Sequence, residues 1–198
     1  MKKKCICLIV SIFSFLTVYS QENFSKFYFS GYRVVVIPEE TFQIKIINNF
    51  DAIQEVTQDG VLRYAVKDQN GRVPKDTLYL YTNEIKYMQL HNSELVMNTP
   101  LQGDSLTVGV TSAFGKLNVD TKFLKINAVA GSRFSVKGMT LFLNCSVGAG
   151  SHVNARELEA KQSELNVMGY SSLTINSEEI IKEDINENSH FRNVYVDK

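Results

Sequence analysis

The residues best suited to chemistry in this sequence are basic and hydrogen-bonding side chains that recur in its second half. They are Lys116, Arg133 and His152; Asp120, Lys137 and Arg156; and, between these two sets, Asn118, Ser135, Asn154 and Thr174. A guanidinium binds a sulfate or carboxylate through paired hydrogen bonds, and amides and hydroxyls bind the hydroxyls of a sugar. On one surface these residues would form two largely basic rows beside a polar trough, which suits a sulfated or uronic-acid glycan. The alternative is a solvated sheet face whose charges oppose edge pairing and aggregation.

Other reactive residue types do not indicate catalysis or a metal site. The histidines lie at different offsets of the repeat or on separate copies, which suggests no three-ligand cluster: His91, His152 and His190. Serines recur at equivalent places of the repeat: Ser132, Ser151 and Ser171. A nucleophilic serine would instead occupy a unique position beside a base, so the recurrence indicates a small residue that fits the turn of each coil. Cys145 alternates in phase with Leu141 and Leu143, which predicts an inert core thiol. The aspartates are scattered, without the carboxylate cluster that a lyase needs for its cation. We expect no enzyme activity, no cofactor and no metal.

The elements that position the polar residues are short strands repeated with a period near 20 residues. One predicted inward column is Leu95, Leu117, Phe134, Val153 and Leu173. Two residues later stand Met97, Val119, Val136, Ala155 and Ile175. Two residues earlier stand Ser93, Gly115, Ser132, Ser151 and Ser171. Side chains alternate along a strand, so the intervening polar positions face outward. This pattern is typical of stacked coils and predicts a β-helix or solenoid of about five to six short rungs. An antiparallel meander with fortuitous spacing is the alternative.

The first half of the chain predicts strands in hairpins. The β-branched run 32–37 and the alternating run 42–47 flank a turn at 38–41, which favours a hairpin. Asp59-Gly60 is a turn dipeptide before a strand that starts at Val61. Residues 51–58 have the spacing of a turn or two of helix. The fold class is therefore all-β, with an N-terminal hairpin region at 21–84 that continues into solenoid rungs at 85–198, as a single domain.

The N-terminus has the features of a cleavable signal peptide over residues 1–20. Lys2 to Lys4 precede an uncharged stretch that is too short to span a bilayer, and Val18 and Ser20 suit a cleavage site before Gln21. Loss of these three lysines leaves 18 basic and 21 acidic residues, a net charge of −3. This charge argues against general nucleic-acid binding. We expect an exported chain without a transmembrane segment after cleavage.

Several motifs recur in order along the chain: the opening strand 24–36 with Ser30-Gly31, the Asp59-Gly60-Val61-Leu62 segment, and the rungs VAGSRFSV (129–136) and VGAGSHVNA (147–155). They resemble motifs of the putative auto-transporter adhesin, head GIN domain proteins of bacterial envelopes. Asn92, Phe114 and Tyr170 depart from the family's rung glycine, and Asn193 stands where an apolar residue belongs. The resemblance implies an all-β, partly β-helical protein at the envelope or outside the cell, with no catalytic residues.

Two functions follow from these observations. The first is an exported, adhesin-like binding module for a glycan, such as an anionic one, or for an envelope or host protein. The second is a structural or assembly component that self-associates through exposed strands. A β-helical carbohydrate-active enzyme is the third and least favoured interpretation. The predicted location is the periplasm, the outer membrane or the outside of the cell.

Overall fold

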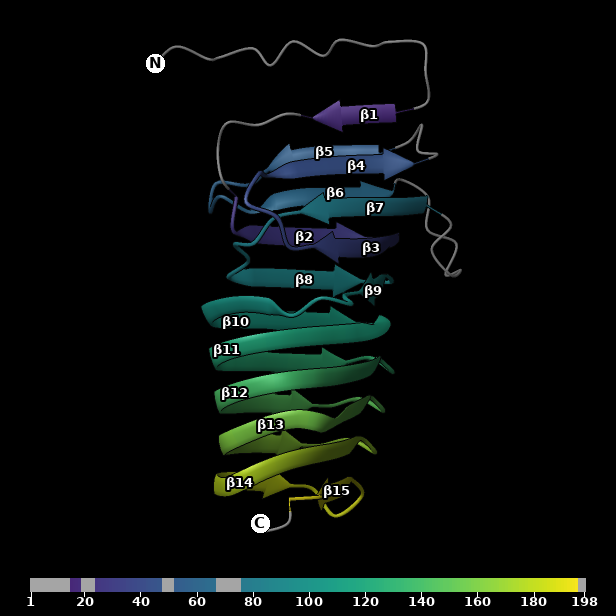
Figure 1. Cartoon of the computed structure of the whole chain (residues 1–198). Coiled ribbons are helices and arrows are strands. Elements are labelled where there is room, and N and C mark those ends of the chain that lie inside the picture. Colours follow the sequence, from purple (N-terminus) through teal and green to yellow (C-terminus); the bar gives the residue numbers. More distant parts are fainter. Residues whose placement is uncertain (1–14, 19–23, 48–51, 67–75, 196–198) are drawn as a thin grey trace.

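The computed structural model describes residues 15–18, 24–47, 52–66 and 76–195, and every helix-or-strand element within them is a β-strand (Figure 1). The shorter strands of the first half are β1 (Phe15–Val18), β2 (Lys26–Ser30), β3 (Tyr32–Ile37), β4 (Gln43–Ile47), β5 (Ala52–Val56), β6 (Leu62–Val66), β7 (Asp76–Tyr81), β8 (Tyr87–His91) and β9 (Glu94–Val96). The second half contains β10 (Leu101–Thr111), β11 (Phe114–Val129), β12 (Arg133–Val147), β13 (His152–Val167), β14 (Ser172–Ile185) and β15 (His190–Asn193). The predicted all-β solenoid fold is confirmed.

Each long strand from β11 to β14 bends once, so that one strand contributes to both sheets of the molecule. In β11 the bend lies at Lys122, where the pairing with β12 is interrupted between Thr121 and Phe123. The halves before the bends form sheet 1 together with β9, β3, β7, β4, β1 and β15. The halves after the bends form sheet 2 with most of β10 and with β8, β2, β6 and β5. Successive coils pair in parallel, about 4.8 Å apart, and form a single stack (Figure 1).

The buried columns inside the stack match the prediction except at one coil. Leu95, Phe134, Val153 and Leu173 lie in one column, but Gly115 stands between Leu95 and Phe134. Leu117, predicted for that place, lies two residues further along the strand, at the next inward position, opposite Val136. The prediction was therefore wrong by two residues on this coil, although every side chain keeps its inward face.

The same shift affects the two neighbouring columns. Val119, predicted opposite Val136, lies opposite Gly138, and Ala113 rather than Gly115 aligns with Ser132. The physical reason is that a glycine occupies an inward position. The φ angle of Gly115 is +150°, and a Cβ there would lie 2.3 Å from the carbonyl oxygen of Leu95. An apolar pattern cannot reveal an inward position that has no side chain.

The N-terminal strands extend the stack instead of forming the predicted hairpin of residues 32–47. Strand β7 lies between β3 and β4, parallel to the first and antiparallel to the second, so that hairpin prediction was wrong. The helical turn expected at 51–58 is also wrong, because β5 forms a hairpin with β6 around the Asp59-Gly60 turn. Strands β2 and β3 pair in parallel with β8 and β9 and so form a further coil.

Buried serine hydroxyls line the turns that connect sheet 2 to sheet 1. The hydroxyl of Ser132 accepts a hydrogen bond from the backbone N–H of Ala113 (3.2 Å) and donates one to the carbonyl of Val129 (2.6 Å). The hydroxyl of Ser151 accepts the N–H of Ser132 on the preceding coil (3.1 Å). The recurrent serines thus satisfy backbone groups where the chain turns, which agrees with a structural role.

We expect Ser151→Ala to lower the free energy of unfolding by about 1–3 kcal/mol, because the buried N–H of Ser132 loses its acceptor. Urea titration measures this effect. Ser135→Ala is the matched control, because Ser135 is exposed on the same sheet, and it should change stability by less than about 0.5 kcal/mol. Equal effects of the two substitutions would contradict the role assigned to Ser151.

The C-terminal end of the stack is partly closed by side-chain hydrogen bonds. Strand β15 pairs with β14 only over Ser172–Ile175. Beyond it, the amide of Asn193 accepts the N–H of Ser177 (3.1 Å) and donates to its carbonyl (2.9 Å), as a further strand would. Asn193 lies opposite the buried Ile175 but is itself exposed, and its amide is used for these hydrogen bonds. Further along the edge, Glu183 lies opposite the buried Leu165.

The predicted signal peptide lies outside the described residues except for Phe15–Val18, which form β1 and pair antiparallel with β4. The predicted cleavage site at Ser20–Gln21 lies outside them as well. In the described parts of the chain, no helix has the length and hydrophobicity to cross a membrane.

Candidate functional site

The predicted basic residues lie on the outer face of sheet 1, in a different alignment from the one expected. Arg133 and His152 are neighbours in one column, as predicted, but Phe114 instead of Lys116 precedes Arg133. Lys116 lies in the next column, opposite Ser135. The two-residue shift at Gly115 causes this change, because every outward residue of that coil moves with it.

The second basic row and part of the polar row are not formed as predicted. The side chain of Asn118 is buried, and its amide donates to the carbonyl of Asn98 (2.7 Å). Lys137 is exposed opposite Asn118, beside the candidate site and not in it. Asp120 lies opposite Met139 and lines a separate depression near the bends.

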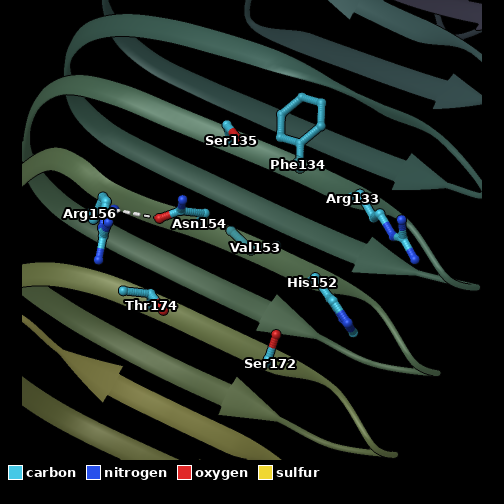
Figure 2. A pocket seen from close by; sticks show the side chains of 9 residues that line it. All are labelled: Arg133, Phe134, Ser135, His152, Val153, Asn154, Arg156, Ser172 and Thr174. Carbon is cyan, nitrogen blue, oxygen red and sulfur yellow. Dashed lines mark hydrogen bonds between the residues drawn. The ribbon is translucent and has the colours of Figure 1, made fainter.

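Six of the ten predicted site residues surround one shallow depression of about 410 Å³ on β12, β13 and β14 (Figure 2). Its lining consists of Arg133, Phe134, Ser135, His152, Val153, Asn154, Arg156, Ser172 and Thr174. Phe134 and Val153 are buried core residues, so the floor is the sheet itself. The polar side chains stand around this floor and leave it open to solvent.

A β-bulge places Arg156 at this depression. Ser135 of β12 pairs with Asn154, whereas Lys137 pairs with Glu157, so β13 has one extra residue in this interval. A bulge of this kind redirects the side chain next to it. The side-chain oxygen of Asn154 accepts the backbone N–H of Arg156 (3.3 Å), which supports the bulged backbone (Figure 2).

A second depression of about 630 Å³ continues the first along sheet 1 and shares Arg133 and Ser135 with it. It adds Lys116, the half-exposed ring of Phe114, and Arg33 of β3. We call the two depressions together the trough. It crosses β9 and the first halves of β11 to β14, a length of about 19 Å at the usual strand spacing. Arg33 was not predicted, because the parallel pairing of β3 with β9 leaves no pattern in the sequence. Phe114 was not predicted, because the shift at Gly115 places it beside Arg133.

The ionisable side chains that line the first depression are all basic. Its lining contains Arg133, Arg156 and His152, and none of its lining residues is Asp or Glu. The ion pairs found among the described residues involve other cations, such as Arg33 with Glu94 in the second depression (3.5 Å). The guanidinium groups of Arg133 and Arg156 are therefore available to an external anion.

The remaining candidates for reactive groups are metal-binding clusters and the free cysteine Cys145. In the described part of the chain, no group of three or more His, Cys, Asp or Glu side chains could hold a metal ion. Cys145 is buried, and burial raises the pKa of its thiol to about 12, which keeps it protonated and unreactive. This agrees with the core role predicted for it.

The architecture defines the class: a two-sheet parallel β-solenoid with a polar trough on one face. The chain belongs to the family described as "Putative auto-transporter adhesin, head GIN domain", whose model matches residues 27–194. The predicted resemblance is thus confirmed. No curated protein matches the chain.

Several solved structures share this fold. A putative adhesin from Bacteroides fragilis superposes with a TM-score of 0.67 at 10% identity and covers 91% of this chain and 97% of its own. A putative lipid binding protein from Parabacteroides distasonis superposes with a TM-score of 0.57 at 10% identity and covers 90% of this chain and 95% of its own. A putative adhesin from Parabacteroides merdae superposes with a TM-score of 0.56 at 13% identity and covers 91% of this chain and 95% of its own. At these identities the similarity establishes the fold.

Proposed function

We propose that this protein is an exported, non-catalytic module of the bacterial envelope or surface that binds an anionic polysaccharide along the trough. The observation that carries the proposal is the first depression, which gathers Arg133, Arg156 and His152 without a lining carboxylate. Glycosidases need a pair of carboxylates at the scissile bond, so this lining suits binding without cleavage. The family description and the predicted signal peptide support an adhesin-like role outside the cytoplasm.

The shape and chemistry of the trough fit a sugar polymer. Guanidinium groups can hold sulfate or carboxylate groups through paired hydrogen bonds. Between them, Ser135, Asn154 and Thr174 offer hydroxyl and amide groups to sugar hydroxyls. The trough runs along the stack across several coils, so an extended chain can contact several of them at once.

The test is retention on an immobilised heparin-type or alginate-type polysaccharide at low salt. We expect the wild-type protein to be retained and to elute at roughly 0.5 M salt, because salt screens surface charge pairing. Arg133→Glu combined with Arg156→Glu should abolish retention. The matched control is Lys122→Glu with Lys161→Glu, which makes the same charge change on exposed residues at the bends.

Retention of the control variant together with loss in the trough variant supports the proposal. Passage of the wild-type protein through the column at low salt contradicts it. Equal loss in both variants also contradicts it, because binding would then follow net charge and not the trough.

The alternative of self-association through exposed strands uses the sheet edges and not the sheet face. Sedimentation velocity separates the two, because self-association raises the sedimentation coefficient with protein concentration in the absence of any polysaccharide. Binding along the trough leaves the free protein at one sedimentation coefficient and changes it only when polysaccharide is added.

A further inference from the structure

Three of the turns that lead into sheet 1 share one backbone conformation, and one of the three carries an unexpected residue. In three successive turns, two consecutive residues have positive φ: Ala130 (57°) with Gly131 (72°), Ala149 (50°) with Gly150 (72°), and Gly169 (66°) with Tyr170 (59°). Such turns favour Gly or Asn at both places, because a Cβ is crowded in the left-handed region. In the third turn, a tyrosine occupies the second place, where its two counterparts are glycine.

Folding does not explain the choice of tyrosine. The side chain of Tyr170 is 76% exposed, more than any other large hydrophobic side chain among the described residues. Its ring takes part in none of the aromatic or cation–π contacts found in the described part of the chain. A residue that strains the backbone while most of its side chain stays in solvent indicates a role outside folding.

Tyr170 lies at the border of the first depression. It stands two residues before Ser172, which lines the depression and pairs with His152, so the Cα atoms of Tyr170 and Ser172 are at most about 7 Å apart. On the neighbouring coil the equivalent residue is Gly150, where a Cβ would meet nothing within 4 Å. Gly150 has no side chain, so nothing at that position on the neighbouring coil covers the ring of Tyr170.

We propose that Tyr170 is an aromatic platform on which one sugar ring of the bound polysaccharide stacks. This inference rests on the proposed function and narrows its ligand to a polyanion built of rings. The C–H face of a pyranose packs on an aromatic face, while the phenol hydroxyl stays in water and can bond to a sugar hydroxyl. Tyrosine suits such a site because it offers a large, rigid contact area at a low cost in conformational entropy.

The test compares binding and thermal stability in the same variants. Binding is measured to a heparin oligosaccharide and to polyphosphate, a polyanion without rings. Tyr170→Gly should weaken heparin binding about ten-fold, as expected for a lost aromatic contact. It should leave polyphosphate binding unchanged, and its Tm should equal or exceed that of the wild type, because glycine tolerates positive φ. Tyr170→Phe keeps the ring and should bind heparin within about two-fold of the wild type.

The outcomes separate this inference from the proposed function. A wild-type protein that does not bind heparin overturns both. A wild-type protein that binds, together with a Tyr170→Gly variant of equal affinity, overturns only the platform. A lower Tm in Tyr170→Gly also overturns it, because the ring would then have a folding role. Equal weakening toward polyphosphate would assign Tyr170 to general anion binding and contradict sugar stacking.

Discussion

Replacement of Phe134 by alanine is expected to lower the free energy of unfolding by about 3–5 kcal/mol, measured by urea titration. Phe134 is 2% exposed, and its neighbours in the column are Gly115 and Val153. A cavity left by the ring cannot be filled from the side of Gly115, which has no side chain.

The matched control is Phe123→Ala, which removes the same ring from a side chain that is 57% exposed. Phe123 contacts Phe142 at the bend with ring centroids 6.1 Å apart, so we expect a loss of no more than about 1 kcal/mol. A Phe134→Ala loss below about 1 kcal/mol would show that this residue does not belong to the core.

Replacement of Gly138 by alanine is expected to destabilise the protein by about 3 kcal/mol or more. The φ angle of Gly138 is +113°, and a Cβ there would lie 1.8 Å from the carbonyl oxygen of Val119. The strained backbone costs about 1–3 kcal/mol. Displacement of the neighbouring strand adds a similar amount. Thermal or urea unfolding measures the sum.

Gly131→Ala separates these two contributions. Gly131 also has positive φ (+72°), but its Cβ would meet nothing within 4 Å, so only the backbone cost of about 1–2 kcal/mol remains. Similar losses for Gly131→Ala and Gly138→Ala would mean that the close approach to Val119 does not matter for stability.

Local patterning was sufficient to predict the coils of the second half. Apolar residues alternate with polar ones at strand period, and the small residue before each strand recurs because the turn accepts a serine. The columns of Phe134, Val153 and Leu173 therefore followed from the sequence alone. The N-terminal topology did not, because β3 pairs in parallel with β9, whose residues lie about 60 positions later. No turn dipeptide or periodicity marks such a pairing.

The positions of the candidate site residues could be predicted from the sequence only where the alignment of neighbouring strands was predicted correctly. Arg133 with His152 and Ser135 with Asn154 were aligned correctly because no glycine lies within 133–135 or 152–154. Lys116 was misplaced by the inward glycine one residue before it. The bulge at Arg156 is a local backbone feature that the pattern of side chains does not encode.

The C-terminal end of the stack has a consequence for how these molecules behave when crowded. An uncovered end of a β-stack is equivalent to the growing tip of a cross-β fibril, because its free backbone groups can template another strand. Here the amide of Asn193 fills the next hydrogen-bonding places at Ser177. Any further coil would also have to bury the carboxylate of Glu183 in line with Leu165, which is costly. Asn193 and Glu183 thus disfavour the addition of another strand at this edge of the stack.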